Sequence, residues 1–299
     1  MNNKLKKYLN NNRKIIEREI KKHISGSASL SRVLKTAVTY SVFSRGKRLR
    51  PILVLSASRA CDGNIYNALP VAATLELIHT YSLIHDDLPA MDDDDLRRGR
   101  PACHKKFGEA MAILAGDALL TKSFEILAKN GKLFRLKTRY YQDLIRVIST
   151  AAGMEGMVGG QAEDILSENN AGTHNLGLVL KIHSGKTAAL LSACTEAGAL
   201  CAGADTKKRT KLSRYGFLLG LGFQVMDDVL DRIGDKSELG KKGSDLDNNK
   251  LTFPSVIGID KSVQFAKKKI SEAIAELQTF GAQADPLRWI AEYVITRNK

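Results

Sequence analysis

Two acidic clusters, each at the C-terminal end of a long apolar segment, constrain this chain more than any other feature. The first, Asp86-Asp87-Leu88-Pro89-Ala90-Met91-Asp92, follows the apolar segment 68–85. The second, Asp227-Asp228-Val229-Leu230-Asp231, follows the apolar segment 217–226. Such segments predict buried helices. Carboxylates at a helix C-terminus repel one another and the negative end of the helix dipole, so this arrangement is unfavourable without a bound cation.

The spacing within each cluster indicates which acids point the same way. Asp227 and Asp231 are four residues apart and share a helix face, whereas Asp228 is turned away by about 100°. We therefore expect Asp227 and Asp231 to face inward, with Asp228 as a supporting acid. Asp86 and Asp92 are six residues apart with a proline between them, so only a kinked or extended helix end aligns them.

Carboxylate oxygens suit Mg²⁺, which commonly bridges protein carboxylates to substrate phosphates. Two clusters therefore predict two metal-lined walls that face one polyphosphate. The alternative, an exposed acidic helix end, does not account for the apolar segment before the second cluster.

The composition favours one large α-helical domain over residues 1–299. The chain has 43% hydrophobic residues and only six prolines, and no linker or composition break divides it. Its net charge of +14 allows nucleic acid, a membrane surface or anionic substrates as partners. Lysine-rich segments such as 4–22 and 207–214 are typical of solvated helix faces. Since no RNA-binding or zinc-finger signature accompanies them, we expect no nucleic-acid partner.

The cysteines and the apolar pattern bear on the cellular compartment. Cys61, Cys103, Cys194 and Cys201 fit neither a zinc site nor a disulfide framework, so we expect buried, reduced thiols. The first 13 residues lack the apolar core of a signal peptide, and no apolar run is long enough to span a membrane. We expect a cytoplasmic protein that is not an integral membrane protein.

Hydrophobic periodicity and turn residues predict the order of helices along the chain. Residues 235–252 are polar and contain glycine, which favours a loop. The predicted helices cover residues 1–25, 30–43, 52–60, 68–85, 107–128, 140–157, 176–200, 211–230, 262–280 and 285–297.

Cationic residues accompany the acids. Arg97-Arg98-Gly99-Arg100 follows the first cluster directly, and the planar fork of arginine matches phosphate oxygens. Gly46-Lys47-Arg48-Leu49-Arg50-Pro51 adds a second dense patch, and Lys186-Thr187 is unremarkable in isolation. His79 lies seven residues before Asp86 on roughly the same helix face. A lone histidine there is usually a core residue, and only the nearby anion-binding groups favour a functional role.

Taken together and in order, these motifs resemble the trans-isoprenyl diphosphate synthases. The first acidic cluster has the form D-D-x-x-x-x-D and the second has the form D-D-x-x-D. The likeness spans roughly residues 40–255 and is closest to bacterial farnesyl diphosphate synthases, also called geranyltranstransferases. The other motifs that carry it are Gly46 to Pro51, Gly160-Gln161 with Asp164, Lys186-Thr187, Phe223-Gln224, Gly240-Lys241, Gly243-Ser244-Asp245 and Lys250.

This resemblance implies an all-α, isoprenoid-synthase-type helical bundle around a deep central cavity, in a homodimer. It implies about three Mg²⁺ ions per site, replaceable by Mn²⁺, and isopentenyl and allylic diphosphates as substrates. The implied metal ligands are Asp86, Asp87, Asp92, Asp164, Asp227, Asp228 and Asp231. The allylic diphosphate would be contacted by Arg97, Lys186, Lys241 and Lys250, and isopentenyl diphosphate by Lys47, Arg50, His79 and Arg98. Thr187 and Gln224 would face the allylic cation, and Gln161 would be a further substrate-binding residue.

Product length should depend on the floor of the cavity. Tyr81, five residues before Asp86, would stop a growing chain early, and in the resembling family an aromatic residue here accompanies the fifteen-carbon product. The sequence departs from the family pattern at Ala188-Ala189, where Gly-Ala is frequent, and at Phe253, where tyrosine is common. The final Arg297-Asn298-Lys299 resembles a basic tail that closes over the site.

Several alternatives remain open. A longer-chain synthase, giving geranylgeranyl or longer products, would share every motif and differ only in cavity depth. A terpene cyclase would have little need for the cationic residues Lys47, Arg50 and His79. A non-catalytic partner subunit would be expected to have lost acids from one cluster. A nucleic-acid-binding protein is suggested by the net charge alone.

Overall fold

The apolar segment before the first acidic cluster forms a helix that is buried over most of its length. In this computed structural model, which describes residues 3–25, 30–130, 138–168, 175–233 and 251–297, that helix is α4 (Ile65–Asp86). Its N-terminus is capped by Asn64, whose side chain accepts from the backbone N–H of Tyr66. Helix α11 (Thr206–Ile233) is the second long buried helix and ends just after the second acidic cluster.

The remaining elements are nearly all helical, which confirms the predicted all-α class. They are α1 (Asn3–Ser25), α2 (Arg32–Val42), α3 (Leu49–Ala60), β1 (Leu96–Arg97), β2 (Arg100–Pro101), α5 (Cys103–Phe107), α6 (Glu109–Asn130), α7 (Thr138–Ala152), α8 (Met157–Glu168), α9 (Leu176–His183), η2 (Ser184–Ala188), α10 (Ala189–Cys201), α12 (Phe253–Ile257), α13 (Ile259–Glu276), η3 (Ala282–Ala284) and α14 (Asp285–Thr296).

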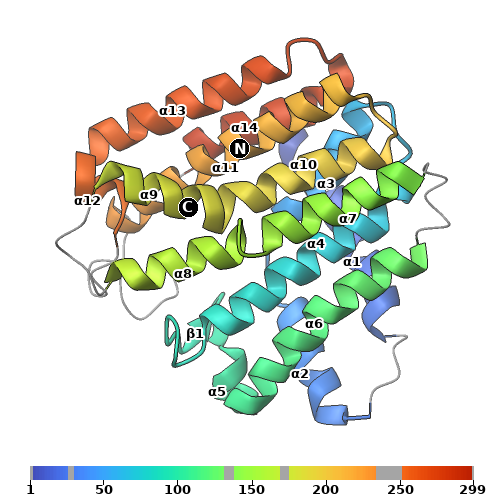
Figure 1. The fold of residues 1–299 in the computed structure, drawn as a ribbon, viewed down its shortest axis with the longest axis vertical. Helices are drawn as coiled ribbons and strands as arrows, with labels where there is room; N and C mark the ends of the chain where they lie inside the picture. The colour runs from blue at the N-terminus through green and yellow to red at the C-terminus, as the bar shows by residue number, and fades with distance from the viewer. Residues whose placement is uncertain (1–2, 26–29, 131–137, 169–174, 234–250, 298–299) are drawn as a thin grey trace.

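The helices lie side by side, and the packing order runs from α13 through α11, α10, α3 and α4 to α6 (Figure 1). Buried apolar side chains from α1 through α14 join in one contiguous core. Tyr215 is among its largest fully buried side chains, and its hydroxyl donates to the carbonyl of Leu287 at 2.7 Å. Most of α4 and residues 215–229 of α11 are buried, so neighbouring helices cover these segments on nearly every side, and both acidic clusters emerge where this packing ends.

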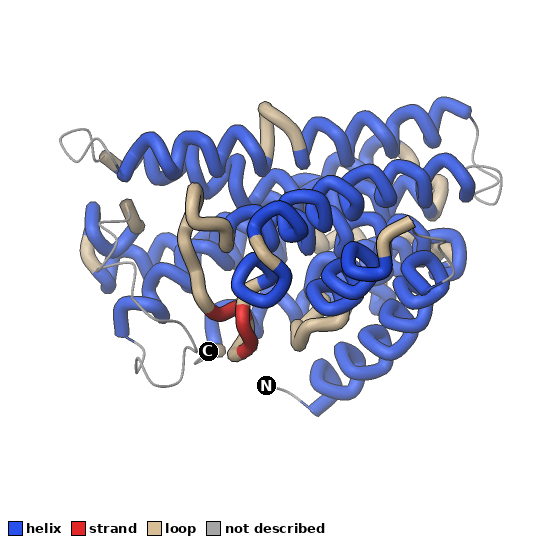
Figure 2. Tube along the Cα trace, turned by 90° about the horizontal axis from the view of Figure 1, so that it is seen from below, coloured by secondary structure: helices blue, strands red, loops and turns tan. Residues whose placement is uncertain are grey.

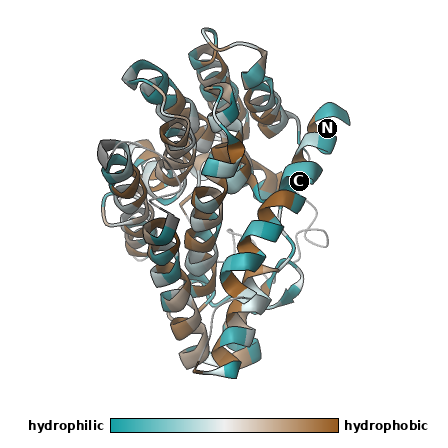
Figure 3. Ribbon diagram, turned by 90° about the vertical axis from the view of Figure 1, so that its right-hand side faces the viewer, coloured by the Kyte–Doolittle hydropathy of each residue, from teal (hydrophilic) through white to brown (hydrophobic). Residues whose placement is uncertain are grey.

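The outer helices are amphipathic. Hydrophilic and hydrophobic residues alternate along α1 (Figure 3), and its inward side carries Leu5, Ile16, Ile20 and Ile24. All four cysteines are free and buried, as predicted. Within the described ranges no helix has both the length and the apolar character needed to cross a membrane.

The helix boundaries differ from the prediction in two glycine-containing segments. The predicted helix 107–128 is divided at Gly108, whose φ of 86° separates α5 from α6. The predicted helix 140–157 ends at Ala152, and Gly159-Gly160 lies inside α8 rather than after a helix. Helix α8 approaches η2 so closely that a Cβ on Gly160 would lie 2.1 Å from the backbone nitrogen of Lys186. Close packing on η2 explains Gly160, whereas a Cβ on Gly159 would clash with the carbonyl oxygen of Met154 just before α8.

The predicted helix 176–200 forms, with a π-helical turn, η2, between α9 and α10. This turn carries Lys186 and Thr187. Single π-helical turns inside α-helices occur frequently at functional sites.

A short hairpin follows the first acidic cluster, where the sequence analysis identified only a cationic motif. Strands β1 and β2 are antiparallel, with Arg97 opposite Arg100 (Figure 2). Arg98 and Gly99 between them both have positive φ, 56° and 74°. Positive φ at both central residues characterises a tight two-residue hairpin turn. The hairpin fixes the backbone at Arg97 and therefore the direction of its side chain.

Candidate active site

A cavity of about 670 Å³ opens between the ends of α4 and α11. Both acidic clusters reach it, together with side chains from α3, α8, α9 and η2. The predicted site residues that line it are Arg50, His79, Tyr81, Asp86, Asp92, Arg97, Gln161, Asp164, Lys186, Thr187, Gln224, Asp227, Asp228 and Asp231. The structure therefore gathers residues up to 181 positions apart, from 50 to 231, around one space.

The loop after α4 folds back so that both ends of the first cluster line the cavity. The backbone N–H of Asp92 donates to the carbonyl of Asp86 at 2.9 Å, which closes the loop that Pro89 begins to turn. Burial raises the pKa of Asp86 to about 6, with neighbouring Asp92 adding to the effect and Lys186 opposing it. A carboxylate in this setting gains from a nearby cation.

Asp87 is not brought to the cavity with the other acids of the cluster. It is 2% exposed and accepts from Arg97 Nε at 2.7 Å as well as from Arg97 Nη2. Arg97 also donates to Asp94 at 2.9 Å. Because Asp87 points away from the cavity, its position favours orienting Arg97 over the metal-binding role given by the resemblance.

In the second cluster, Asp227 faces the cavity and pairs with the end of the chain. Its Oδ1 lies 2.7 Å from Arg297 Nη2, and the same guanidinium stacks over the Phe223 ring at 4.1 Å. Burial raises the pKa of Asp227, and Arg297 opposes that shift. Arg297 is 7% exposed, so the last described residue of the chain lies inside the site.

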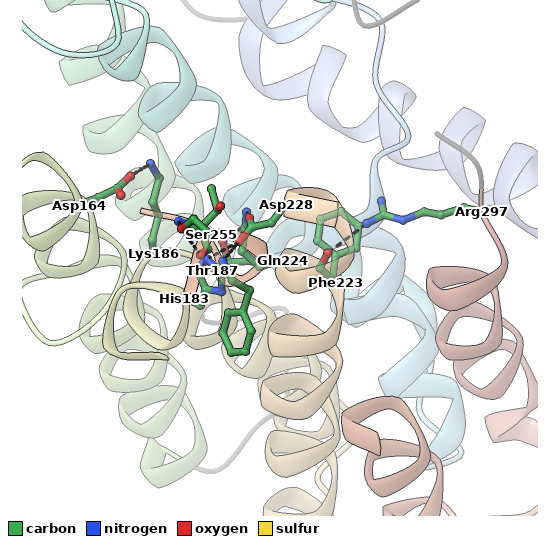
Figure 4. A network of polar contacts seen from close by, with 11 residues as sticks. Asp164, His183, Lys186, Thr187, Phe223, Gln224, Asp228, Ser255 and Arg297 are labelled. Carbon is green, nitrogen blue, oxygen red and sulfur yellow. Dashed lines mark hydrogen bonds and ion pairs between the residues drawn. The ribbon is translucent and has the colours of Figure 1, made fainter. Parts of the chain in front are cut away.

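Asp228 is engaged by protein groups on both oxygens. Gln224 Nε2 donates to Oδ1 at 3.2 Å, and the backbone N–H of Phe253 donates to Oδ2 at 2.9 Å. His183 Nε2 lies 3.3 Å from the same Oδ2 (Figure 4). These contacts agree with a supporting acid, and they occupy the oxygens that the metal-binding assignment of Asp228 would need.

Lys186 is held at the opposite wall by Asp164. Lys186 Nζ donates to Asp164 Oδ2 at 2.6 Å, and Figure 4 shows this pair beside Thr187 and Gln224. Thr187 in turn donates to Gln224 Oε1 at 2.7 Å. Asp164, given as a metal ligand by the resemblance, therefore acts in this structure as the partner of a cation.

A cationic region adjoins the cavity on the α3 side. Burial, followed by the charges of Arg50 and Arg98, lowers the pKa of His79 well below its ordinary value, so this imidazole is neutral at pH 7. Arg50 and His79 line the cavity, whereas Arg98 contacts Ser44 at 3.3 Å outside it. Lys47 is exposed, with Nζ 5.9 Å from the centre of the Tyr293 ring. Of the four predicted isopentenyl diphosphate contacts, only Arg50 and His79 are cavity residues.

Sequence reasoning missed Glu76 and His183. Glu76, inside α4, accepts from the buried Arg48 guanidinium at 2.6 Å. A single acid within the apolar segment 68–85 was the signal that such a partner existed. His183 is 5% exposed, and its ring stacks on Phe253 at 5.4 Å. Nothing in its local sequence distinguished it from a core histidine. Lys241 and Lys250, predicted to contact diphosphate, lie outside the described residues.

The donor set fits Mg²⁺. No three histidine, cysteine or acidic side chains in the described part of the chain converge on one point. The cavity carboxylates instead stand on two walls, where a bound diphosphate would complete the oxygen ligands that Mg²⁺ requires. The raised pKa of Asp86 and of Asp227 marks two partly buried carboxyl groups whose charge a divalent cation would offset.

An all-α bundle whose central cavity has acids on two walls and cations beside them defines the fold and site of a prenyltransferase. The chain belongs to the polyprenyl synthetase family, which matches residues 31–292.

Relatives and solved structures agree with this family. The chain is 42% identical to a farnesyl diphosphate synthase of Geobacillus stearothermophilus, with 98% of each chain covered. It is 41% identical to a geranylgeranyl diphosphate synthase of Cyanophora paradoxa, covering 97% of this chain and 96% of the relative. An FPP/GFPP synthase structure from Zymomonas mobilis superposes with a TM-score of 0.86 at 36% identity, covering 98% of this chain and 99% of that one. The relatives' names thus agree on the reaction class and differ in product length.

Proposed function

We propose that the protein is a Mg²⁺-dependent prenyltransferase that makes farnesyl diphosphate. It would condense isopentenyl diphosphate head to tail with dimethylallyl diphosphate and then with geranyl diphosphate, releasing diphosphate each time. The observation that carries the proposal is the pair of carboxylate walls across one cavity, with Asp86 and Asp92 on one side and Asp227 and Asp231 on the other. Residues 1–299 would form a single catalytic domain, acting as a homodimer in the cytoplasm.

The cavity suits ionisation of an allylic diphosphate. The allylic carbon–oxygen bond breaks, and its electron pair leaves with the diphosphate. About three Mg²⁺ ions, or Mn²⁺ in their place, would be held by Asp86, Asp92, Asp227 and Asp231 and would neutralise the leaving group. Arg97 and Lys186 would contact the same diphosphate, and their own partners, Asp87 and Asp164, hold both cations in place before substrate arrives.

The second substrate would bind on the cationic side. Arg50 and His79 line the cavity there and would hold isopentenyl diphosphate, with Lys47 and Arg98 close by. The isopentenyl double bond attacks the allylic carbon, and a proton is then lost to the released diphosphate. Gln161 lines the same space, and its buried amide makes no hydrogen bond within the described residues, so it is available to a substrate. The apolar helices exclude water, which would otherwise quench the cation.

Tyr81 supports the fifteen-carbon product. It is 6% exposed and lines the cavity one helical turn before Asp86. Its ring meets His85 edge to face, with centroids 5.8 Å apart. This aromatic pair would limit the length of the growing chain.

The test is a product analysis with labelled isopentenyl diphosphate, dimethylallyl diphosphate and Mg²⁺. We expect farnesyl diphosphate as the end product. A geranylgeranyl or longer product, which the name of the Cyanophora paradoxa relative favours, would retain the chemistry and reject the role of Tyr81. Absence of any product, with geranyl diphosphate also inactive, would indicate a non-catalytic partner subunit instead.

A further inference from the structure

A directed chain of hydrogen bonds runs from Asp228 into the cavity. Gln224 Nε2 donates to Asp228 Oδ1 at 3.2 Å, and Thr187 Oγ1 donates to Gln224 Oε1 at 2.7 Å (Figure 4). All three side chains line the cavity. The chain therefore links a buried carboxylate in α11 to a hydroxyl in η2.

Each step of this chain fixes the direction of the next. An ionised carboxylate only accepts hydrogen bonds, so the amide nitrogen of Gln224 must face Asp228. The amide oxygen of Gln224 is then left to face Thr187. Because that oxygen cannot donate, the hydroxyl proton of Thr187 must point at it. The lone pairs of the Thr187 oxygen remain for the cavity.

His183 and Phe253 hold Asp228 in this orientation. The Phe253 N–H donates to Oδ2 at 2.9 Å, and His183 Nε2 lies 3.3 Å from the same atom. Within the described residues His183 Nδ1 is buried without a hydrogen-bond partner, and a proton there would be left unsatisfied. The proton is therefore assigned to Nε2, facing Asp228. Stacking on Phe253, at an interplanar angle of 21°, fixes the imidazole ring.

We propose that Asp228 and His183 are positioning residues, which fix the hydrogen-bond direction so that oxygen lone pairs, and not protons, of Thr187 and Gln224 face the allylic cation. This inference rests on the proposed function, because it requires a cationic intermediate in the cavity. Oxygen dipoles that are oriented before the reaction stabilise a developing positive charge without reorganisation. Because both oxygens already accept from protein donors, we assign Asp228 to positioning rather than to metal binding.

The substitution Asp228→Asn reverses the chain without changing its shape. The Phe253 N–H still requires an acceptor, so the amide oxygen of Asn takes that place and its NH₂ group faces Gln224. Gln224 must then turn its oxygen toward position 228 and its NH₂ toward Thr187. The Thr187 hydroxyl becomes an acceptor, and its proton is directed into the cavity.

Steady-state kinetics of the full-length variant test this prediction. With geranyl and isopentenyl diphosphates, we expect kcat to fall about 100-fold, the order seen when one preorganised dipole is lost from an active site. KM for both substrates should stay within about 3-fold, because the diphosphate contacts of Arg97 and Lys186 are untouched. In the Thr187→Val background, which has no hydroxyl to reverse, Asp228→Asn should lower kcat by about 10-fold or less, because only the Gln224 amide is then reversed.

Thermal unfolding separates positioning from metal binding. Mg²⁺ with inorganic diphosphate should raise the Tm of Asp228→Asn as much as that of the unsubstituted protein. The matched variant Asp231→Asn, one helical turn further on, should lose part of that increase, because we assign Asp231 to the metal site. His183→Phe keeps the ring stack, and we expect a smaller fall in kcat with the same increase in Tm.

The outcomes are distinguishable. An unchanged kcat in Asp228→Asn, or a lost Tm increase with Mg²⁺ and diphosphate, overturns the positioning role while the unsubstituted protein remains an active prenyltransferase. Equal effects of Asp228→Asn with and without the Thr187 hydroxyl also overturn it. An unsubstituted protein that forms no prenyl product refutes the proposed function, and the inference with it.

Discussion

At the scale of single residues, the site holds charges that the fold alone disfavours. Asp86 has its pKa raised from 3.8 to about 6, first by burial and then by neighbouring acids, with Lys186 opposing. Between these two pH values the folded protein binds the proton more tightly than the unfolded chain does. Its stability therefore falls as the pH rises through this window and remains lower above it. This loss of stability is the consequence of keeping an ionised carboxylate where we propose that Mg²⁺ binds.

Replacing this carboxylate with its neutral analogue should stabilise the protein in the absence of metal. We expect Asp86→Asn to raise the free energy of unfolding at pH 7.5 by up to about 3 kcal/mol, the value of a shift from 3.8 to about 6. Below pH 4 the two proteins should be equally stable. Urea unfolding at both pH values measures the difference, and a variant less stable than the original at pH 7.5 contradicts the argument. With Mg²⁺ and diphosphate present, the order should reverse.

At the scale of elements, the floor of the cavity depends on the approach of α6 to α4. His85 Nε2 lies 3.1 Å from the carbonyl oxygen of Ile113, and a Cβ on Gly116 would lie 2.1 Å from the same nitrogen. The absent side chain of Gly116 thus makes room for His85, which packs against Tyr81. The contact of α6 with α4 therefore determines the position of the Tyr81–His85 pair.

Opening this floor should lengthen the product. Tyr81→Ala removes the ring from the cavity, so we expect geranylgeranyl diphosphate or longer products to replace farnesyl diphosphate in a product analysis. Tyr66→Ala is the matched control, because Tyr66 belongs to the same helix but is 72% exposed. Chain length that stays unchanged in Tyr81→Ala, or that changes equally in both variants, would reject the floor.

A buried ion pair joins the start of α3 to the middle of α4. Arg48 is the N-cap residue of α3, with a φ of 52°, and it donates to Glu76 at 2.6 Å and to the carbonyl of Val42 at 2.7 Å. This pair supports the segment that carries Arg50 to the cavity.

Breaking the pair from one side should cost more than replacing both partners. Arg48→Met removes the hydrogen-bonded cation of the buried Glu76 and leaves only the more distant charges of Arg50 and Arg98, so the free energy of unfolding should fall by up to about 3–5 kcal/mol. The double variant Arg48→Met with Glu76→Leu should recover most of that loss, because no charge stays buried. Denaturant unfolding measures both variants, and a double variant as unstable as the single one would show that the charge pairing is not the cause.

At the scale of the whole molecule, the two helices that end in the acidic clusters, α4 and α11, could be predicted because their local composition determines their burial. Apolar residues on nearly every side of α4 and of residues 217–226 in α11 require burial, and the spacing from Asp227 to Asp231 gives one helix face. The predicted helix 140–157 left Gly160 outside a helix because the role of this glycine depends on η2, which approaches from elsewhere in the chain. The assignments of Asp87, Asp164 and Asp228 depended in the same way on partners that the sequence does not place beside them.

The contact between the C-terminal end and the second acidic cluster is the longest-range example. Arg297 Nη2 pairs with Asp227 Oδ1 at 2.7 Å and donates to the carbonyl of Phe223 at 3.0 Å. The Arg297 side chain is only 4% exposed, whereas that of Asp227 is 35% exposed. In the absence of metal, this guanidinium is therefore the main cation beside Asp227, with a weaker attraction from Lys47.

Arg297→Ala should make the stability of the protein depend more strongly on metal. Without Mg²⁺, Asp227 loses its ion-paired cation, and the free energy of unfolding should fall by about 1–3 kcal/mol, less than for a fully buried pair because Asp227 is partly solvated and Lys47 still attracts it. Mg²⁺ with inorganic diphosphate should offset most of the electrostatic part of this loss, since it supplies a new cation to the same carboxylate. Lys268→Ala removes an exposed positive charge from α13 and should change stability equally little in both conditions. If Arg297→Ala lost the same stability with and without Mg²⁺ and diphosphate, its packing on Phe223 rather than its charge would be the main contribution.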